Sequence, residues 1–508
     1  SALNDSSTIT ENVVTCPALF ISAPSSGEGK TTITSALARY FKNQGKVVRV
    51  FKTGPDYLDP QILEQASGNE VQPLDMWMAG DAWCRDKLFS AAQCSDLILI
   101  EGAMGLFDGD PSSADLAAKF GIPVVVVMNV KGMAQTAGAI VRGLANYRDD
   151  FNLVGMIANH CATNRHRELI ELALPSDINL IATFARDEEV ALPERHLGLV
   201  QASEVADELE KRFENGAQAL INGGMSMDGR YPENAGSNFQ GMSKDEHLSS
   251  MQVPENAGRN FKGQINKQSD WLKPITFTRP TPSELQPFKT EKWLTGKTIA
   301  IAKDKAFSFI YQSNVLLLEQ MGAKVKYFSP LNDATLPKAD ALWLPGGYPE
   351  LYAENLAKNK SMLLAIADFF QKDKAILAEC GGLLYCLETL TDLKDQQYPM
   401  LNILQGHGAM RGKRGCQGMQ TACLPEGEIR GHAHHRSRTQ DTPSPVGYGR
   451  RQRHAAPGEE IYRTKQLTAS YLHLFFASNP TAVAQIFNPS LVNNANSYNK
   501  VGEAQTTC

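Results

Sequence analysis

Short runs of apolar, often β-branched residues alternate with longer amphipathic stretches through the first half of the chain. Runs of roughly four to eight such residues are typical of buried strands, whereas the longer stretches have the spacing of helices. Strands that alternate with helices in this way predict a parallel α/β sheet with helices on both faces. The strands expected from the pattern are residues 17–23, 46–52, 96–101, 123–130 and 153–158.

A second series of the same kind begins near Thr298. Its expected strands are residues 298–303, 324–328, 340–344 and 374–379, and a helical pattern follows Gly382. At 508 residues the chain is longer than one hydrophobic core normally serves, so each series is expected to form a domain of its own. The predicted fold class is α/β with two domains.

The stretch from about Asn222 to Thr290 separates the two series and breaks their pattern. Gly, Asn, Ser, Pro and Gln accumulate there, which makes it too polar to bury a core. A short unit that starts at Pro232 recurs from Pro254, and two copies are too few for a solenoid. We expect a first domain at 1–222, a polar linker or insertion at 223–295, a second domain at 296–490 and a disordered tail at 491–508.

The overall composition argues against several classes of partner. A net charge of −5 gives no positive surface for nucleic acid or an anionic membrane. No apolar run is long enough to span a bilayer, and the polar N-terminus lacks the features of a secretory signal, so a cytoplasmic location is expected. Nine cysteines, an odd number without metal-type spacing, favour reduced thiols over a disulfide framework. The sequence leaves a homodimer open.

The first expected strand runs into PSSGEGKTT and then into a helical pattern, which is the arrangement of a phosphate-binding P-loop. The glycines let the backbone amides close on an anion, the lysine places a charge on the terminal phosphates of ATP, and the threonine after it offers a hydroxyl to Mg²⁺. Pro24 replaces the usual first glycine, but an ordinary glycine-rich turn does not account for the rest. The candidate ATP-binding residues are Gly27, Gly29, Lys30, Thr31 and Thr32.

Acidic residues follow two expected strands at the carboxyl edge of the first sheet, where open α/β sheets bind ligands. Glu101 ends one strand, and Thr53, Asp56 and Asp59 lie in the loop after another. Carboxylates beside a nucleotide usually hold magnesium, so Thr31, Asp56 and Glu101 form the candidate metal site. A solvated strand-end acid and a plain Pro-bracketed turn are the alternatives for these positions.

The second domain carries the pattern of a cysteine nucleophile. Cys380 follows an expected strand and precedes two glycines and a helix, a sharp elbow that exposes the thiol at a helix N-terminus. The positive end of the helix dipole there is expected to favour the thiolate. Gly346 and Gly347 follow another strand and can point N–H groups at a developing oxyanion, together with Gly381 after the nucleophile. A buried, unreactive cysteine is the alternative, and the same interpretation fits Cys386.

A thiol nucleophile needs a base, and the best candidate is His473, at the end of an apolar strand. His432, His434 and His435 compete with it, but their run, GHAHHRS, is more typical of a polar loop or a metal-binding loop.

These motifs, in this order, resemble those of the cobyrinate a,c-diamide synthase family. The resemblance rests on SSGEGKTT, KTGPDYLDP, EGAMGLFDG, LPERHLGLV, PGGYPE, AECGGL and SYLHLFF. It implies a dethiobiotin-synthetase-like ATP domain followed by a class I glutamine amidotransferase domain. In such enzymes ATP phosphorylates the a and c acetate carboxylates of a corrinoid, and ammonia from L-glutamine displaces the phosphate. ATP, glutamine and the macrocycle are the implied substrates, and Mg²⁺ the cofactor.

The resemblance also assigns roles to single residues. Thr53, Leu58 and Asp59 match positions tied to the macrocycle, and Asp56 and Glu101 match positions tied to the metal. Cys380 and His473 match the glutaminase pair. Asn159, at the end of an expected strand, resembles the asparagine that reads adenine.

The sequence departs from the family at two places. Phe475 stands where related glutaminases have a glutamate two residues after the histidine, so His473 must be oriented by something else. In GHAHHRS, Ala433 replaces an acid, and His434 and Arg436 replace aromatic residues.

Other functions share many of these motifs. Hydrogenobyrinate a,c-diamide synthase and a nickel-sirohydrochlorin amidase are alternatives within the class, because the ring metal leaves the acetate arms unchanged. A partition-type P-loop ATPase with an inactive glutaminase module is the alternative of another class. For the amidotransferase we expect a cavity that carries ammonia between its two sites.

Overall fold

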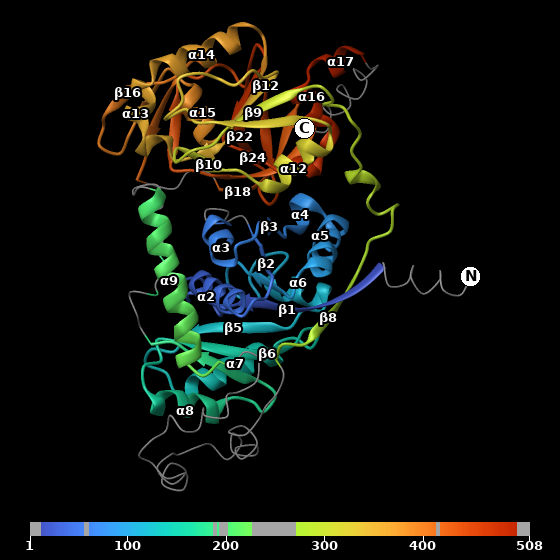
Figure 1. Ribbon diagram of the computed structural model, residues 1–508, viewed down its shortest axis with the longest axis vertical. Coiled ribbons are helices and arrows are strands. Elements are labelled where there is room, and N and C mark those ends of the chain that lie inside the picture. The colour runs from blue at the N-terminus through green and yellow to red at the C-terminus, as the bar shows by residue number, and fades with distance from the viewer. Residues whose placement is uncertain are drawn as a thin grey trace, which may run out of the picture. The chain divides into compact units, whose positions relative to one another are not determined.

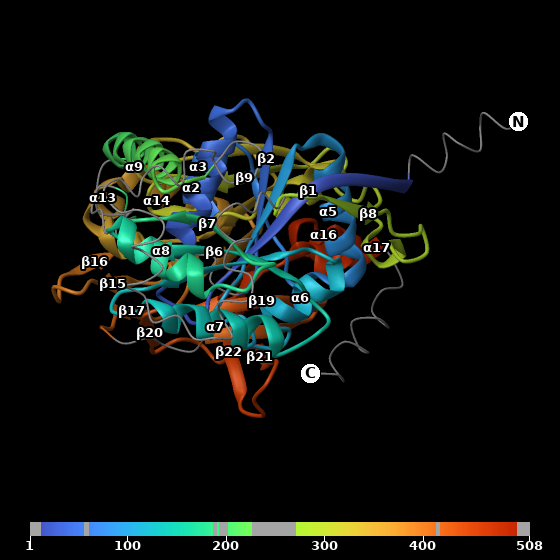
Figure 2. The same cartoon turned by 90° about the horizontal axis from the view of Figure 1, so that it is seen from below.

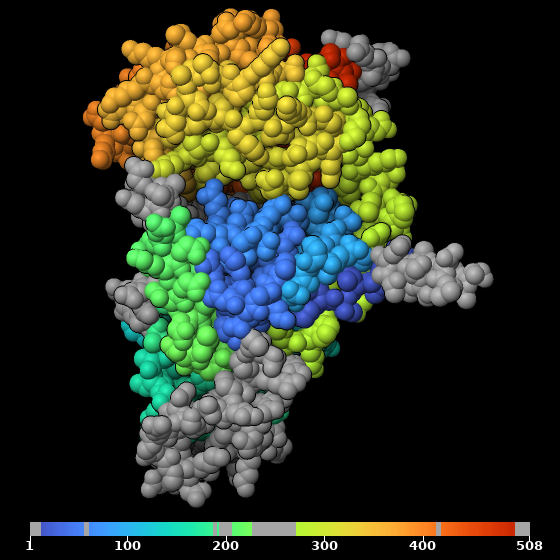
Figure 3. Space-filling model, viewed as in Figure 1, coloured from blue at the N-terminus to red at the C-terminus, as the bar shows by residue number. Residues whose placement is uncertain are grey.

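The computed structural model describes residues 12–54, 60–185, 190, 192, 202–225, 271–412 and 417–494 (coloured in Figure 3). It divides into two compact units. The first takes in Ser1–Met76, Cys84–Arg195 and Ser203–Pro280, and the second takes in Thr281–Cys508 with two short pieces, Trp77–Trp83 and His196–Ala202. Within the described ranges no helix has the length and apolar character needed to cross a bilayer.

A parallel seven-stranded path forms the centre of the first unit (Figure 1), in the order β3-β2-β4-β1-β5-β6-β7. β4 is buried along its whole length and β5 up to Met128, as a sheet covered on both faces requires. All five strands expected from the sequence are present. The strands are β1 (Val13–Ser22), β2 (Val48–Lys52), β3 (Val71–Pro73), β4 (Leu97–Glu101), β5 (Val124–Asn129), β6 (Leu153–Asn159) and β7 (Asn179–Thr183).

Helices cover both faces of this sheet, as right-handed crossovers require. Figure 2 shows α2 and α9 together on one side of the strands and α7 and α8 on the other. Both pairs pack closely through glycine: a Cβ at Gly216 of α9 would lie 3.0 Å from the Cβ of Ala36, and Gly138 of α7 abuts Ala173 in the same way. The helices in this part of the chain are α2 (Lys30–Asn43), α3 (Pro60–Ser67), α4 (Met76–Ala79), α5 (Asp81–Cys94), α6 (Ser113–Phe120), α7 (Gln135–Asn146), α8 (Asn164–Ala173) and α9 (Ala202–Asn222). Most of α4 and the start of α5 fall in Trp77–Trp83, the piece that belongs to the second unit.

The segment expected to be a linker contains a strand of the first unit. β8 (Pro274–Thr278) pairs antiparallel with the first half of β1, from Val13 opposite Thr278 to Pro17 opposite Pro274. The sequence pattern missed it because the strand is short and only Phe277 is buried. The expectation of a linker throughout 223–295 is therefore wrong at β8, while the duplicated unit lies outside the described residues.

A ten-stranded mixed sheet dominates the second unit, in the order β11-β9-β12-β14-β23-β22-β21-β18-β19-β24. The first five strands are parallel to one another, and the rest are added antiparallel. The four strands expected from the sequence are β9, β11, β12 and β14. The strands are β9 (Thr298–Ala302), β11 (Lys324–Phe328), β12 (Ala341–Leu344), β14 (Ala375–Glu379), β18 (Gln417–Leu424), β19 (Gly427–His434), β21 (Gly447–Arg451), β22 (Pro457–Thr464), β23 (Leu467–Ser470) and β24 (His473–Leu474).

Smaller elements complete the second unit. β10 (Phe307–Phe309) pairs with β13 (Gly346–Gly347), and a small sheet has the order β16-β15-β17-β20. Its strands are β15 (Thr389–Thr391), β16 (Gln397–Pro399), β17 (His407–Met410) and β20 (Ser437–Gln440). The helices are α12 (Gln312–Gln320), α13 (Ala353–Lys358), α14 (Lys360–Gln371), α15 (Gly381–Cys386), α16 (Pro480–Phe487) and α17 (Ser490–Asn494), with short 3₁₀ turns at Gln286–Phe288, Pro349–Leu351 and Phe476–Ser478.

Two expectations need correction in this unit. The tail expected from residue 491 begins with helix, because α17 continues to Asn494. Cys423 is disulfide-bonded, so the expectation of reduced thiols fails there, whereas six other described cysteines are free thiols.

Candidate active site

The P-loop lies between β1 and α2, as the sequence predicts. Gly27 and Gly29 have φ angles of 82° and 96°, which L-residues with side chains rarely adopt, and α2 begins at Lys30. A Cβ at Gly29 would lie 2.6 Å from the amide nitrogen of Asn159, which also donates to the carbonyl of Glu28 at 3.2 Å. Asn159 therefore lies against the backbone of the P-loop.

Glu28 was not singled out from the sequence, yet it fixes the P-loop in place. Its carboxylate accepts hydrogen bonds from the backbone N–H of Asn129 at 2.5 Å and from the hydroxyl of Ser25 at 3.0 Å. These bonds tie the loop to the end of β5. The only signal in the sequence was an acid between the two glycines of GEGK.

Thr31 and Glu101 meet beside the P-loop. The hydroxyl of Thr31 donates to Oε1 of Glu101 at 2.5 Å, and Glu101 is 3% exposed. The other carboxylate oxygen, Oε2, is buried and has no hydrogen-bond partner among the described residues. A hydroxyl and an unsatisfied carboxylate oxygen are ligands that Mg²⁺ prefers, so these residues fit a magnesium ion. Asp56, the third candidate, lies outside the described residues.

The loop after β4 packs on the P-loop. The ammonium group of Lys30 donates to the carbonyl of Met104 at 2.5 Å, and the N–H of Leu106 donates to the carbonyl of Ala23 at 2.9 Å. Two hydrogen bonds to the loop after β4 thus fix the P-loop, the segment around Lys30 that would bind phosphates.

Thr53 has a hydroxyl that is already engaged by the backbone. It donates to the carbonyl of Glu101 at 3.2 Å and accepts from the N–H of Ala103 at 3.1 Å. Thr53 therefore joins the ends of β2 and β4 beside the candidate metal site. Leu58 and Asp59 lie outside the described residues.

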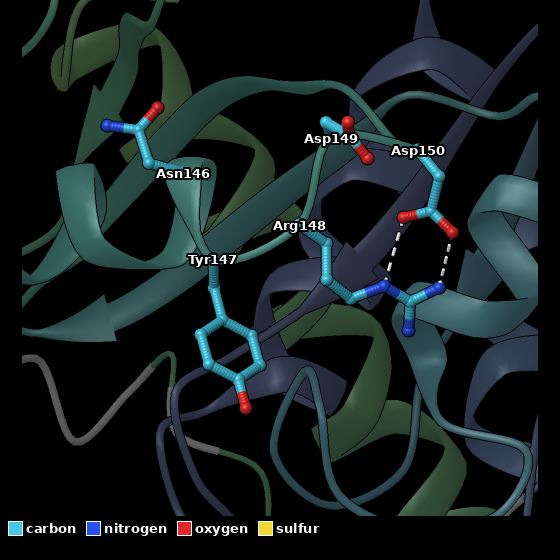
Figure 4. Close-up of a pocket in the computed structure, with 5 residues that line it drawn as sticks. All are labelled: Asn146, Tyr147, Arg148, Asp149 and Asp150. Atoms are coloured by element: carbon cyan, nitrogen blue, oxygen red, sulfur yellow. Dashed lines mark hydrogen bonds and ion pairs between the residues drawn. The ribbon is translucent and has the colours of Figure 1, made fainter.

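An open hollow lined by residues 146–150 is found at the opposite edge of the same sheet (Figure 4). Arg148 and Asp150, two of its lining residues, bind each other directly through contacts of 2.9 and 2.6 Å, and Arg148 also binds Asp115. The hollow precedes the start of β6, whereas the P-loop lies at the strands' carboxyl ends. It takes no part in the candidate nucleotide site.

In the second unit Cys380 forms a sharp elbow between β14 and α15. Its φ angle is 49° and its ψ angle is −104°, a conformation rare for a residue with a side chain. A Cβ at Gly381 would lie 2.9 Å from a ring carbon of Pro349 and 3.0 Å from the backbone nitrogen of Gly347, and one at Gly382 would overlap the carbonyl of Leu344. The missing side chain at Gly381 lets the amide of Gly347 approach the elbow, and that at Gly382 lets the carbonyl of Leu344 do so.

His473 lies on β24, and its ring is so close to Gly346 that a Cβ there would overlap it. The ring stacks on that of His432, with centroids 4.9 Å apart and planes 19° from parallel. His432 is held in turn by the hydroxyl of Tyr311 at 2.6 Å. The structure thus brings His473 to the strand that carries Gly346 and Gly347.

The protonation states of Cys380 and His473 are set mainly by burial. Burial raises the pKa of the Cys380 thiol above its usual range, and the carboxylates of Glu350, Glu459 and Glu379 add to this, against the N–H of Gly381. Burial, with His434 and His435 nearby, lowers the pKa of His473 to about 3. The expectation of a resting thiolate is therefore wrong, because desolvation outweighs the helix terminus. The resting pair is a neutral thiol and a neutral imidazole.

The amidotransferase half of the chain matches the family model of the CobB/CobQ-like glutamine amidotransferase domain over residues 298–481, and the nucleotide-binding half matches the CobQ/CobB/MinD/ParA nucleotide binding domain over residues 19–200. A hydrogenobyrinate a,c-diamide synthase of Stutzerimonas stutzeri is 41% identical over 93% of this chain and 99% of its own. A cobyrinate a,c-diamide synthase of Herminiimonas arsenicoxydans is 40% identical over 93% of this chain and 97% of its own. The chain belongs to the a,c-diamide synthase family.

The regions that match the two family models contain the two groups of candidate site residues described above. The P-loop, Thr31 and Glu101 lie inside the matched nucleotide-binding region, and Cys380 and His473 lie inside the matched amidotransferase region. A second relative named hydrogenobyrinate a,c-diamide synthase, from Pseudomonas aeruginosa, is 41% identical over 94% of this chain and 98% of its own.

The histidine run of this family member is a strand where a polar loop was expected. His432 and His434 lie on β19, which pairs with β24 and β18. His435 binds the carboxylate of Glu459 at 2.8 Å and stacks on Tyr471 at 3.6 Å. Among the described residues no group of three His, Cys, Asp or Glu side chains could hold a metal ion.

The neutral thiol predicts slow alkylation of Cys380. Iodoacetamide reacts with the thiolate, so we expect Cys380 to react at neutral pH at least about tenfold more slowly than the exposed Cys94, and its rate to go on rising above pH 8. Mass spectrometry of the modified peptides measures both rates in one sample. A Cys380 rate that is already constant below pH 7 would show a stabilised thiolate.

Proposed function

We propose that this chain is an ATP-dependent, glutamine-hydrolysing enzyme that amidates the a and c acetate groups of cobyrinate. The observation that carries the proposal is the strained elbow at Cys380, whose Gly381 lies against the backbone nitrogen of Gly347 while Gly346 lies against the ring of His473, in the same chain as a P-loop with a Thr31–Glu101 pair. An enzyme that makes ammonia and activates a carboxylate needs both groups of residues.

In the glutaminase reaction, the sulfur of Cys380 attacks the side-chain amide carbon of glutamine while His473 accepts the thiol proton. The oxyanion that forms lies toward the N–H groups of Gly347 and Gly381, with Gly346 leaving room for the histidine ring. His473 returns the proton to the leaving nitrogen, and ammonia departs. Water then attacks the thioester, which releases glutamate and the free thiol.

In the synthetase reaction, the terminal phosphoryl group of ATP passes to an acetate carboxylate, giving ADP and an acyl phosphate. Ammonia attacks the acyl carbon, phosphate leaves, and the amide remains. Lys30 and the amides around Gly27, Gly29 and Thr32 bind the phosphates. Magnesium would be held by Thr31, Glu101 and Asp56, and when bound it neutralises phosphate charge.

The remaining assignments concern recognition. Asn159 lies against the P-loop and would contact the base of ATP, while Leu58 and Asp59 would contact the macrocycle. For Thr53 we propose a supporting role, since its hydroxyl already joins two backbone groups of the loop. We expect the reaction to take place in the cytoplasm, where ATP and glutamine are available.

The cobalt-free hydrogenobyrinate is the second candidate substrate, because two relatives at 41% identity carry that name. The test offers cobyrinate and hydrogenobyrinate in parallel to the purified chain with ATP, Mg²⁺ and glutamine, and follows the products by mass spectrometry. Conversion of cobyrinate to a diamide supports the proposal, and diamide from the cobalt-free ring alone would replace cobyrinate by the second candidate. Amidation of neither ring would contradict the proposal.

A further inference from the structure

The orientation of His473 is the part of the glutaminase site that the family comparison leaves unexplained. Phe475 stands two residues after it, where related glutaminases carry a glutamate, and this side chain is completely buried. No carboxylate at that position can hold the imidazole.

Another carboxylate joins the strand of His473 to the nucleophile. Glu379 is the last residue of β14, directly before Cys380, and it is 2% exposed. Its Oε2 accepts a hydrogen bond from the backbone N–H of Leu474 at 2.6 Å, and its Oε1 accepts one from the indole N–H of Trp343 at 2.6 Å. Leu474 directly follows His473, so one side chain connects the residue before the nucleophile with the residue after the base.

The backbone of the segment that follows His473 makes further hydrogen bonds, to the side chain of Asn314 and to another strand. Asn314, which is buried on α12, donates to the carbonyl of Leu474 at 2.9 Å and accepts from the N–H of Phe476 at 2.9 Å. The N–H of Phe475 donates to the carbonyl of Arg430 at 2.8 Å. The backbone after the histidine is therefore fixed at successive residues, and of these contacts only that of Glu379 comes from the nucleophile's own strand.

A buried carboxylate is a costly way to join two strands. Burial raises the pKa of Glu379 to about 8, although the N–H groups of Leu474 and Trp343 pull it down. An apolar side chain there would leave the N–H groups of Leu474 and Trp343 buried without an acceptor, so the fold needs an acceptor at this place but not an acid. The carboxylate also lies close enough to Cys380 to raise the pKa of its thiol. Fold stability calls for a hydrogen-bond acceptor at residue 379, and it does not require that acceptor to be an acid beside the nucleophile.

We propose that Glu379 is a positioning residue of the glutaminase site, which holds the strand of His473 at a fixed place relative to Cys380 and so replaces the missing carboxylate. It acts through the backbone of Leu474 and touches neither glutamine nor the reacting atoms. The inference rests on the glutaminase function proposed above.

The test is Glu379→Gln in the full chain. The glutamine amide keeps the shape of the side chain but has only one acceptor oxygen, so it can satisfy the N–H of Leu474 or that of Trp343 and not both. A displacement of the base by about 1 Å costs on the order of 100-fold, so we expect the glutamine-dependent kcat to fall by roughly 10- to 100-fold. The KM for glutamine should stay within about threefold, because the contacts to the substrate are unchanged.

Two further variants serve as controls. Glu388→Gln removes a carboxylate that also accepts a backbone N–H, that of Gly406 at 2.8 Å, at the far end of α15. It should leave kcat unchanged. Trp343→Phe removes the indole bond to Glu379 together with part of a buried ring that packs on Phe476, and it should cost kcat much less than Glu379→Gln does, since the bond to Leu474 remains.

A loss of activity that is caused only by poor folding is distinguished from a loss of kcat by counting the competent active sites. A diazoketone analogue of glutamine alkylates Cys380 in folded enzyme, so the labelled fraction gives kcat per active site. A normal kcat per labelled site in Glu379→Gln, or an equal loss in Trp343→Phe, would overturn the positioning role.

Amidation with ammonium salts in place of glutamine tests the proposed function separately, because that reaction bypasses Cys380. Its absence in the wild-type chain would contradict the proposed function. Release of glutamate from glutamine would still report on the role of Glu379.

Discussion

Replacing Cys380 by serine is expected to abolish glutamine-dependent amidation while amidation from ammonium salts continues. The thiol supplies the nucleophile that forms the covalent intermediate, and loss of a nucleophile of this kind costs roughly 10⁴-fold or more in rate. Serine at the strained elbow keeps the shape of the residue but not its acidity. Glutamate release and amide formation should be measured in the same reactions.

The neighbouring free cysteine of α15, Cys386, is the matched control. It is completely buried and its pKa is raised by burial alone, so Cys386→Ala should lower stability without changing the glutaminase kcat per active site. Substantial glutamine-dependent amidation by the Cys380→Ser variant would contradict the assignment of the nucleophile. Loss of ammonium-dependent amidation in that variant would point to a folding defect.

Replacing Glu101 by glutamine is expected to lower amidation with both nitrogen sources, glutamine and ammonium salts, in contrast to the Cys380→Ser variant. The variant removes the charge beside Thr31 but keeps the size of the side chain, so the metal site loses its only described carboxylate. We expect amidation to fall by about 10²- to 10³-fold with either nitrogen source, and the Mg²⁺ concentration needed for half the maximal rate to rise. Direct titration of Mg²⁺ in the presence of ATP measures the second effect.

Glu208→Gln is the control for this substitution. Glu208 is an exposed residue of α9 paired with Arg212 one turn away, and such surface pairs contribute little. Amidation and Mg²⁺ dependence should match those of the wild type. An unchanged Mg²⁺ requirement in Glu101→Gln would remove this residue from the metal site.

Much of both sites can be predicted from the sequence because the deciding signals are local. The glycines of the P-loop and of the elbow occupy backbone conformations or close contacts that other residues do not tolerate, so their spacing predicts the turns directly. The strands before Lys30 and Cys380 are long apolar runs of a buried sheet. The fold class and the place of each candidate residue on it follow from those patterns.

The contacts that fix these residues could not be predicted, because they join distant parts of the chain. Glu28 meets Asn129 and Glu379 meets Leu474 only after the sheets have formed. The thiol of Cys380 was misjudged for a similar reason. Its acidity depends on burial and on the carboxylates of Glu350 and Glu459, which the fold brings to it, as well as on the neighbouring Glu379, and these outweigh the local helix terminus that the sequence shows.

Short or edge elements were missed where the hydrophobic pattern is weak. β8 has only five residues, of which Phe277 alone is buried, so its alternation of apolar and polar residues is too short to be distinctive. The run GHAHHRS looks like a loop by composition, yet pairing with β24 and β18 makes its first half a strand. In both cases tertiary pairing overrides local preference.

The measurement that tests the central claim most directly is transfer of isotope from glutamine labelled in its side-chain amide nitrogen. The intact chain, ATP, Mg²⁺ and cobyrinate are incubated with this glutamine, and the product is analysed by mass spectrometry. The account predicts a diamide that carries the label at both new amides and loses it when Cys380 is serine. A pool of labelled ammonia released from glutamine with no label in the macrocycle, in the presence of ATP, would contradict it.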